Sequence, residues 1–247
     1  MASATVKILQ FDVSASSEAE HARAIIAAAQ AGRGCWICTF NLEILGRALH
    51  DPDYGALLET VDTFVADGAS ILFVSKLLNG ETPQGRTTGV DLVRRLLEAR
   101  ECPAIGIVGG RDPERALNAL ELPRGRVTYL NSGWISTDAA SLEHLAAEIN
   151  DAGCRIVLVA LGVPKQDVVC AYLRRRMPHL VLLGVGGAFE ILGGLTRRAP
   201  RWIQDAGFEW LFRLFQEPRR LARRYLLFYP ATVVRLAALL SRDGAQG

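Results

Sequence analysis

The sequence lacks the features that mark secreted and membrane-spanning proteins. Its first residues, MASATVKILQFDVS, have neither the charged start nor the long apolar centre of a secretion signal. It also has no apolar run long enough to cross a bilayer, since the longest stretch near the C-terminus, residues 226–234, is short and contains Pro230. These absences predict a cytoplasmic protein whose contact with a membrane is peripheral.

Residues that hold metals or carry redox chemistry are also scarce. The chain has 4 His and 5 Cys, and neither type is clustered at the spacing of a metal site. Cys35 and Cys38 form a C-x-x-C, but they lie in a segment typical of a buried strand, whereas a redox thiol pair needs a helix N-terminus to lower its pKa. We therefore expect no metal ion and no cofactor.

Three common fingerprints of enzymes are missing. There is no G-x-x-x-x-G-K-[ST] for a nucleotide phosphate and no G-x-S-x-G for a catalytic serine. The best match to a dinucleotide fingerprint, Gly184-Val-Gly-Gly-Ala-Phe189, lacks the third Gly. This mismatch argues against a dehydrogenase.

The charges are distributed unevenly along the chain. Residues 197–242 hold ten Arg, no Lys and three acidic residues, a net charge of +7, although the whole chain carries only +2. Large apolar side chains such as Trp202, Phe215 and Leu226 are interspersed among them. This mixture is typical of a surface that meets an anionic and partly apolar partner, such as a membrane or a lipid-linked phosphate. A solvated helical subdomain, or a protein that binds nucleic acid, would also account for it.

Apolar segments alternate with amphipathic ones over most of the chain. This alternation predicts an α/β fold with a Rossmann-like, mostly parallel sheet and flanking helices. We expect strands at residues 6–11, 36–40, 104–108, 126–130, 156–161 and 181–185, and helices at 18–31, 51–61, 90–100, 113–120, 141–150 and 166–176. From residue 196 on, only helical patterns remain, at 199–224 and 226–241. We therefore predict a catalytic α/β core over residues 1–195 and a basic helical appendage over 196–247.

Several polar residues follow the expected strands. Because the carboxyl ends of parallel strands form the ligand edge of such a sheet, these residues together suggest a pocket for a sugar and a phosphate. Each one taken alone is more typical of a helix cap or a turn. They are Thr39, Asn41, Asp67, Arg86, Gln166 with Asp167, and Glu190.

The order of the motifs resembles a known family. The strongest match covers residues 184–224, with Gly184-Val-Gly-Gly-Ala-Phe-Glu190, Arg198-Ala-Pro200, Glu209-Trp210 and Glu217-Pro218. The chain resembles the WecG/TagA/CpsF glycosyltransferases, family 26, which make bacterial surface polymers. The resemblance implies inverting, metal-independent transfer from a UDP-sugar to a polyprenyl-diphosphate-linked sugar, on the inner face of the plasma membrane. The donor sugar is typically N-acetylmannosamine, and some relatives use glucose or another hexose.

The resemblance also implies roles for individual residues. Asp67 corresponds to the general base, which takes the proton of the acceptor hydroxyl. Arginines of the appendage would neutralise the departing UDP, because the family's site has no metal to do so. The remaining positions would bind substrate. The residues concerned are Thr39, Asn41, Arg86, Gln166, Gly186, Gly187 and Glu190 for substrate, and Arg213, Arg220 and Arg223 for the diphosphate.

Several points stay open at this stage. Residues 62–76 fit a strand at 70–75 as well as a helix that begins after Gly68; the resemblance implies a strand near Thr63–Ala66 and a helix from about residue 69 to 78. The family often has Gln-Glu where this chain has Gln166-Asp167, and Asp in place of Glu190, which leaves the donor sugar open. A nucleotide-sugar-binding module without catalysis and a homo-oligomer remain alternatives, and no nucleic-acid partner is expected.

Overall fold

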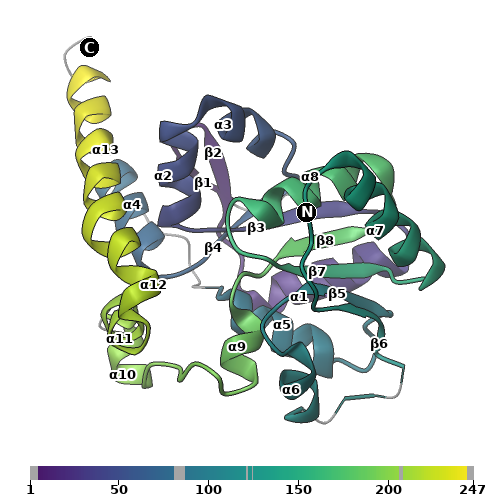
Figure 1. Cartoon of the computed structure of the whole chain (residues 1–247). Coiled ribbons are helices and arrows are strands. Elements are labelled where there is room, and N and C mark those ends of the chain that lie inside the picture. The colour runs from purple at the N-terminus through teal and green to yellow at the C-terminus, as the bar shows by residue number, and fades with distance from the viewer. Residues whose placement is uncertain (1–4, 81–86, 121, 124, 206–207, 244–247) are drawn as a thin grey trace.

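The fold is built on a single eight-stranded sheet with helices on both faces (Figure 1). The computed structural model describes residues 5–80, 87–120, 122–123, 125–205 and 208–243. The strand order is β1-β2-β4-β3-β8-β7-β5-β6; β1 and β2 are antiparallel, and all the other pairs are parallel. The strands are β1 Thr5–Ile8, β2 Phe11–Ser14, β3 Cys35–Phe40, β4 Thr63–Ala66, β5 Ile105–Gly109, β6 Val127–Asn131, β7 Ile156–Ala160 and β8 Val181–Gly184. The expected α/β fold with a mostly parallel sheet is therefore confirmed.

Helices connect the strands and then continue alone to the C-terminus. Those of the α/β part are α1 Glu18–Gln30, α2 Leu42–His50, α3 Pro52–Leu58, α4 Ala69–Asn79, α5 Gly89–Glu98, α6 Pro113–Asn118, α7 Ala139–Asp151, α8 Lys165–Arg176 and α9 Ala188–Leu192. The C-terminal helices are α10 Arg201–Asp205, α11 Glu209–Gln216, α12 Pro218–Arg223, the π-helical turn η1 Arg224–Phe228, and α13 Tyr229–Asp243.

The sheet has a hydrophobic core on each face because its central strands alternate their side chains between the two. On β3, Trp36 and Phe40 pack toward α2, α3, α7 and α8, whereas Ile37 packs toward α1 and α5. On β7, Val157 and Leu158 divide in the same way. Since both faces are covered, only the edges and ends of the strands are left for a ligand.

One expected strand was wrong. Residues 6–11 form no single strand; the chain folds back through Leu9 and Gln10 into the β1–β2 hairpin. Leu9 adopts a φ of 55°, a conformation that large L-residues rarely take, and the turn lacks the Gly or Asn that would have marked it. β2 then pairs with β4, which extends the parallel sheet.

Between β3 and α5, the structure agrees with the strand and helix that the family resemblance implied. The composition alone had left a strand at residues 70–75 open. Thr63–Ala66 is a strand and Ala69–Asn79 a helix, so a strand at residues 70–75 is excluded. Helix α2 was not expected. It begins at Asn41, whose side-chain oxygen accepts hydrogen bonds from Glu43 N (3.0 Å) and Ile44 N (3.2 Å). The helix expected at 51–61 is shorter, Pro52–Leu58.

The C-terminal helices pack against the α/β part along one side of the molecule (yellow in Figure 1). Leu221, Tyr225 and Leu236 are buried. Helix α13 lies against α2, where Gly46 leaves room for Thr232; a Cβ at Gly46 would come within 2.3 Å of the Thr232 hydroxyl. The boundary near residue 195 remains a prediction.

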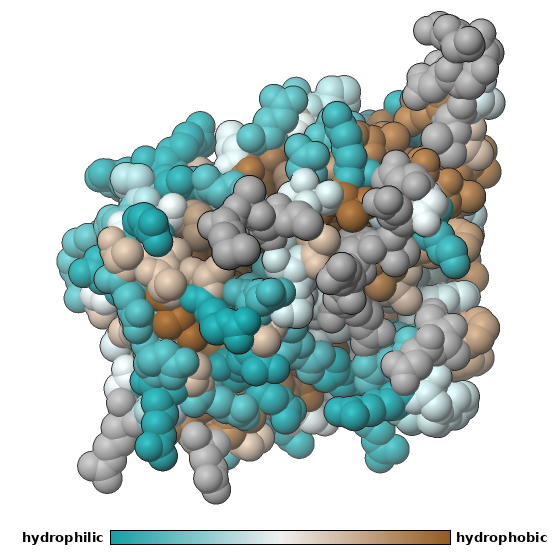
Figure 2. Space-filling model, turned by 180° about the vertical axis from the view of Figure 1, so that it is seen from behind, coloured by the Kyte–Doolittle hydropathy of each residue, from teal (hydrophilic) through white to brown (hydrophobic). Residues whose placement is uncertain are grey.

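Part of this C-terminal segment is apolar and exposed. Figure 2 shows hydrophobic residues gathered at the upper right, on the side of the C-terminal helices. The exposed large side chains of the C-terminal segment include Trp202, Phe215, Leu226, Leu227 and Val234. Within the described residues, no helix combines the length and the hydropathy that crossing a bilayer requires.

A buried carboxyl group lies between α3 and α8. Asp167 is fully buried and accepts a hydrogen bond of 2.7 Å from the Tyr54 hydroxyl, while its Oδ1 has no partner among the described residues. Burial raises the pKa of Asp167 to about 7, although the bond from Tyr54 opposes the change. The folded protein therefore holds this proton over a range of pH where the unfolded chain releases it.

This carboxyl group gives the fold a pH dependence of known sign. Because the folded pKa is raised, stability is lost as the pH rises from about 4, the ordinary value, to about 7. Asp167→Asn should remove this loss, so that the melting temperature falls less between pH 5 and pH 8 than it does for the natural protein. Thermal unfolding at several pH values measures it. Asp138→Asn, at the exposed N-cap of α7, is the control, and an unchanged slope in Asp167→Asn would contradict the assignment.

Candidate active site

A cavity lies at the carboxyl ends of β3, β4 and β8, where the C-terminal helices come over the edge of the sheet. This is the edge at which open α/β sheets bind ligands. The α/β part lines it with Thr39, Asn41, Glu43, Asp67, Gly68, Ala69, Ser70, Thr88, Gly89, Val90, Gly162, Val163, Gln166, Val185, Gly186, Gly187, Ala188 and Ile191. The C-terminal segment adds Arg198, Glu209, Trp210, Arg213, Arg220, Arg224, Tyr225 and Tyr229.

Asp67 stands at the end of β4, next to the N-terminus of α5. Its backbone N–H donates to the Phe40 carbonyl (2.8 Å), and its Oδ1 lies 3.4 Å from the backbone N–H of Gly89. The residue is half-buried and lines the cavity. The backbone of two strands and one helix therefore fixes the position of this carboxylate.

Thr39 and Asn41 form the neighbouring wall after β3. The Thr39 hydroxyl is buried and donates to the Gly184 carbonyl at 2.7 Å, which ties β3 to β8. The oxygen of Asn41 caps α2, and its amide nitrogen donates to the Thr39 carbonyl at 3.5 Å, which leaves the second N–H of the amide for a ligand. Both residues therefore have a structural role as well as a place in the cavity.

Gln166 links α8 to the glycine-rich turn after β8. Its side chain is buried, and its Oε1 accepts a hydrogen bond of 3.0 Å from Gly186 N. A Cβ at Gly184 would lie 2.8 Å from the Gln166 Nε2, so a larger residue there would displace the Gln166 side chain. The turn thus owes its shape to Gln166, and Gly186 and Gly187 line the cavity.

Four arginines of the C-terminal segment line the cavity, and three of them are paired with carboxylates. Arg198 pairs with Asp91, Arg220 with Glu217, and Arg224 with Glu43 at 2.6 Å.

Arg213 is the exception within the described part of the chain. It has no carboxylate partner there, and its buried Nε has no hydrogen-bond partner. One of its terminal nitrogens would lie 3.6 Å from a Cβ at Gly187, so the guanidinium lies beside the glycine-rich turn.

Arg223, expected in the pocket, does not line the cavity. It is exposed at the end of α12, and Arg224 takes the place expected for it. Residues four apart on a helix share a face more closely than residues three apart, so Arg224 lies nearer to the line of Arg220.

Glu190 is not among the residues that line the cavity, although it lies beside the same glycine-rich turn as Arg213. Its Oε2 would lie 3.5 Å from a Cβ at Gly187, and its Oε1 accepts a hydrogen bond of 3.3 Å from the Arg111 backbone N–H. Arg86 lies outside the described residues.

Glu43 was missed by the sequence analysis. It sits on α2, where no motif marked it, and its side chain is only 12% exposed. Burial raises its pKa, and Arg224 and Arg47 oppose this increase. Tyr225 and Tyr229 also line the cavity and were not expected. The only feature of the sequence that pointed to these two residues was the apolar character of the C-terminal segment.

Within the described residues, no three His, Cys, Asp or Glu side chains gather in an arrangement that could hold a metal ion. The cavity instead combines one carboxylate at a strand end, amide and hydroxyl groups, and several guanidinium groups. Such a set is suited to a sugar attached to a phosphate.

The chain matches the model of the WecG/TagA/CpsF glycosyltransferase family over residues 6–244. It belongs to this family. The match spans the α/β part and the C-terminal helices alike, so both belong to the family's common structure. The family is one of glycosyltransferases in cell-surface polysaccharide synthesis, which act in general with a nucleotide-sugar donor and a lipid-linked acceptor.

The two neighbouring arginines offer a matched test of the cavity. Arg224→Ala should lower the turnover of glycosyl transfer by roughly 10-fold or more, since it removes a cation from the cavity and leaves Glu43 unpaired. Arg223→Ala should change it less than about 2-fold, since its side chain points to solvent. Steady-state kinetics with a soluble acceptor measures both. A larger loss for Arg223→Ala would contradict the geometry described here.

Proposed function

We propose that this protein is an inverting, metal-independent glycosyltransferase that moves a sugar from a UDP-sugar to a polyprenyl-diphosphate-linked sugar. The observation that carries the proposal is the meeting of Asp67, from the α/β part, with Arg213, Arg220 and Arg224, from the C-terminal helices, around one cavity. This reaction needs a carboxylate to take the proton of the acceptor hydroxyl and a group of cations to stabilise the leaving diphosphate on the opposite side of the donor sugar.

In this mechanism Asp67 acts as the general base. The acceptor hydroxyl gives its proton to the Asp67 carboxylate while its oxygen attacks the anomeric carbon. The bond between that carbon and the β-phosphate oxygen breaks, and UDP leaves from the opposite face, which inverts the configuration. General-base assistance of this kind contributes roughly 10²- to 10⁴-fold in rate.

The arginines would stabilise the negative charge that develops on UDP. Arg213 is the leading candidate, because its guanidinium has no carboxylate partner among the described residues and lies beside Gly187. Arg220 and Arg224 add charge from the next helical turns. Guanidinium groups already held in place need little reorganisation when the leaving-group bond breaks.

Thr39, Asn41 and Gln166 are proposed to hold the donor sugar, with Gly186 and Gly187 next to the diphosphate. Arg86 and Glu190 remain proposals, the first outside the described residues and the second beside the glycine-rich turn. N-acetylmannosamine is the donor sugar proposed first, and glucose or another hexose is the alternative. An assay with several UDP-sugars decides between them.

The exposed apolar side chains of the C-terminal helices are proposed to dock on the anionic inner leaflet of the plasma membrane. Leu226 and Leu227 of η1 are exposed, and Arg219 and Arg223 lie close to them in the sequence. Each Arg near an anionic surface contributes about 1 kcal/mol. Docking would bring the cavity to the membrane that holds the lipid-linked acceptor.

Asp67→Asn tests the proposed base directly. The amide keeps the size of the side chain but cannot take a proton, so transfer should fall by at least roughly 100-fold while UDP-sugar binding stays within about 3-fold. Transfer is measured with a short-chain prenyl-diphosphate sugar, and binding by calorimetry. Asp138→Asn serves as the control. Full transfer by Asp67→Asn would refute the role, and binding with no transfer by the natural protein would favour a binding module.

The docking surface makes a separate prediction. Leu226→Ser combined with Leu227→Ser should weaken binding to vesicles that contain phosphatidylglycerol by roughly 5-fold or more, because two exposed apolar side chains are lost. Co-sedimentation measures it. Trp134→Ser is the matched control, since Trp134 is 90% exposed but lies outside the C-terminal helices. An equal loss of vesicle binding in the double Leu variant and in Trp134→Ser would contradict this docking surface. Binding to vesicles made of phosphatidylcholine alone would also contradict it.

A further inference from the structure

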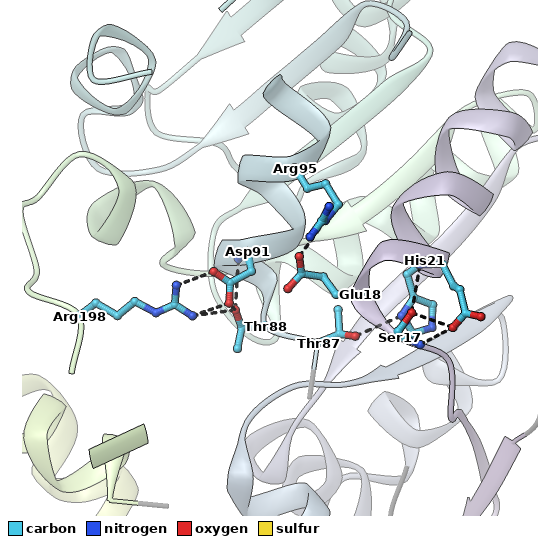
Figure 3. Close-up of polar contacts among 9 residues, drawn as sticks. Ser17, Glu18, His21, Thr87, Thr88, Asp91, Arg95 and Arg198 are labelled. Atoms are coloured by element: carbon cyan, nitrogen blue, oxygen red, sulfur yellow. Dashed lines mark hydrogen bonds and ion pairs between the residues drawn. The ribbon is translucent and has the colours of Figure 1, made fainter. Parts of the chain in front are cut away.

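The segment between α9 and α10 carries an ion pair that the proposed mechanism does not use. Both terminal nitrogens of Arg198 donate to the Asp91 carboxylate, each at 2.5 Å from one oxygen (Figure 3). One of them also lies 3.3 Å from the Thr88 hydroxyl. Both partners are largely shielded from water, with side chains 28% and 32% exposed. A two-pronged pair of this kind fixes direction as well as distance.

On one side, the pair holds the N-terminus of α5. The Thr88 hydroxyl accepts a hydrogen bond from Asp91 N (3.1 Å) and donates to the Asp91 carboxylate (2.6 Å). Within the same turn, Gly89 N lies 3.4 Å from the Asp67 carboxylate. Thr87 also contacts His21, whose Nδ1 lies 3.2 Å from the Thr87 hydroxyl (Figure 3). The turn that Arg198 grips is therefore the turn that contacts the proposed base.

On the other side, the same segment is bound to the C-terminal helices. The Thr196 hydroxyl donates to Glu217 at 3.0 Å. Arg197 and Gln216 exchange two hydrogen bonds, from Arg197 N to the side-chain oxygen (2.8 Å) and from the Gln216 amide to the Arg197 carbonyl (2.9 Å). Glu217 also pairs with Arg220. Residues 196–198 thus connect α5 to the junction of α11 and α12.

We propose that Arg198 and Asp91 are a positioning pair, which sets the C-terminal arginines at a fixed distance from Asp67. The inference rests on the proposed function, since the distance matters only if both ends act on one substrate. In this role Arg198 lines the cavity without binding the diphosphate itself. A misplacement of about 1 Å between reacting groups costs up to roughly 100-fold in rate, so the pair would act on turnover more than on donor binding.

The competing role for Arg198 is that of a direct diphosphate ligand, and a double-mutant cycle separates the two. For a positioning pair, Arg198→Ala and Asp91→Ala should each lower turnover by roughly 10- to 100-fold, change the donor dissociation constant less than about 3-fold, and show no further loss when combined. For a ligand, Arg198→Ala alone would impair turnover and donor binding, while Asp91→Ala would leave Arg198 free to bind.

Arg95→Ala is the matched control. Arg95 lies on the same helix as Asp91 and pairs with Glu18 of α1 at 2.9 Å (Figure 3). Neither Arg95 nor Glu18 lines the cavity. Arg95→Ala should leave turnover within about 2-fold of the natural protein. Asp91→Asn, which keeps the size of the side chain, replaces Asp91→Ala if the latter fails to fold, as judged by its melting temperature.

Hydrogen exchange supplies a readout that does not depend on any reaction. Amides of α11 and α12 should exchange at least about 5-fold faster in Arg198→Ala and in Asp91→Ala than in the natural protein, and at the natural rate in Arg95→Ala. Unchanged exchange in these helices, additive losses of turnover, or an effect of Arg198→Ala alone would overturn the proposal. If the natural protein transferred no sugar, the exchange result would still decide whether the pair positions these helices.

Discussion

The structure depends on the packing of an arginine-rich helical segment against the carboxyl edge of a parallel sheet. Four guanidinium groups approach one cavity, and without counter-charges their mutual repulsion would oppose that packing. Three of them form ion pairs with carboxylates, which are Asp91, Glu43 and Glu217. Arg213, which has no ion-pair partner in the described part of the chain, lies beside the glycine-rich turn, where the Glu190 carboxylate also lies.

This arrangement divides the work between two parts of the chain. The α/β part holds Thr39, Asp67 and Gln166 through hydrogen bonds that involve the backbone of Gly184, Gly89 and Gly186. The helices after residue 195 hold the cations on a layer that buries few of its side chains and exposes apolar residues on its outer side. A membrane that bears on the outer side would therefore act on the cations rather than on the base, which links the two proposals on function.

The sequence was most informative where local pattern and packing agree. Buried parallel strands such as β7 and β8 were predicted almost to the residue, because continuous apolar runs suit a sheet covered on both faces. The β1–β2 hairpin was missed because Leu9 and Gln10 are not typical turn residues. The site residues that belong to sequence motifs could be predicted from the sequence. Glu43 could not, because its place in the cavity depends on its contact with Arg224, which lies more than 180 residues further along the chain. The choice between Arg223 and Arg224 required the position of α12 and η1 over the cavity to be seen.

The central claim is that Asp67 and the C-terminal arginines act on opposite faces of one anomeric carbon, Asp67 through the acceptor hydroxyl and the arginines through the departing diphosphate. A crystal structure with a UDP-sugar and an unreactive acceptor analogue tests this most directly. The account predicts that Arg213 and Arg220 contact the diphosphate and that the Asp67 carboxylate lies within hydrogen-bonding distance of the acceptor hydroxyl, on the opposite face of the anomeric carbon. A diphosphate bound away from these arginines, or an Asp67 remote from that hydroxyl, would contradict it.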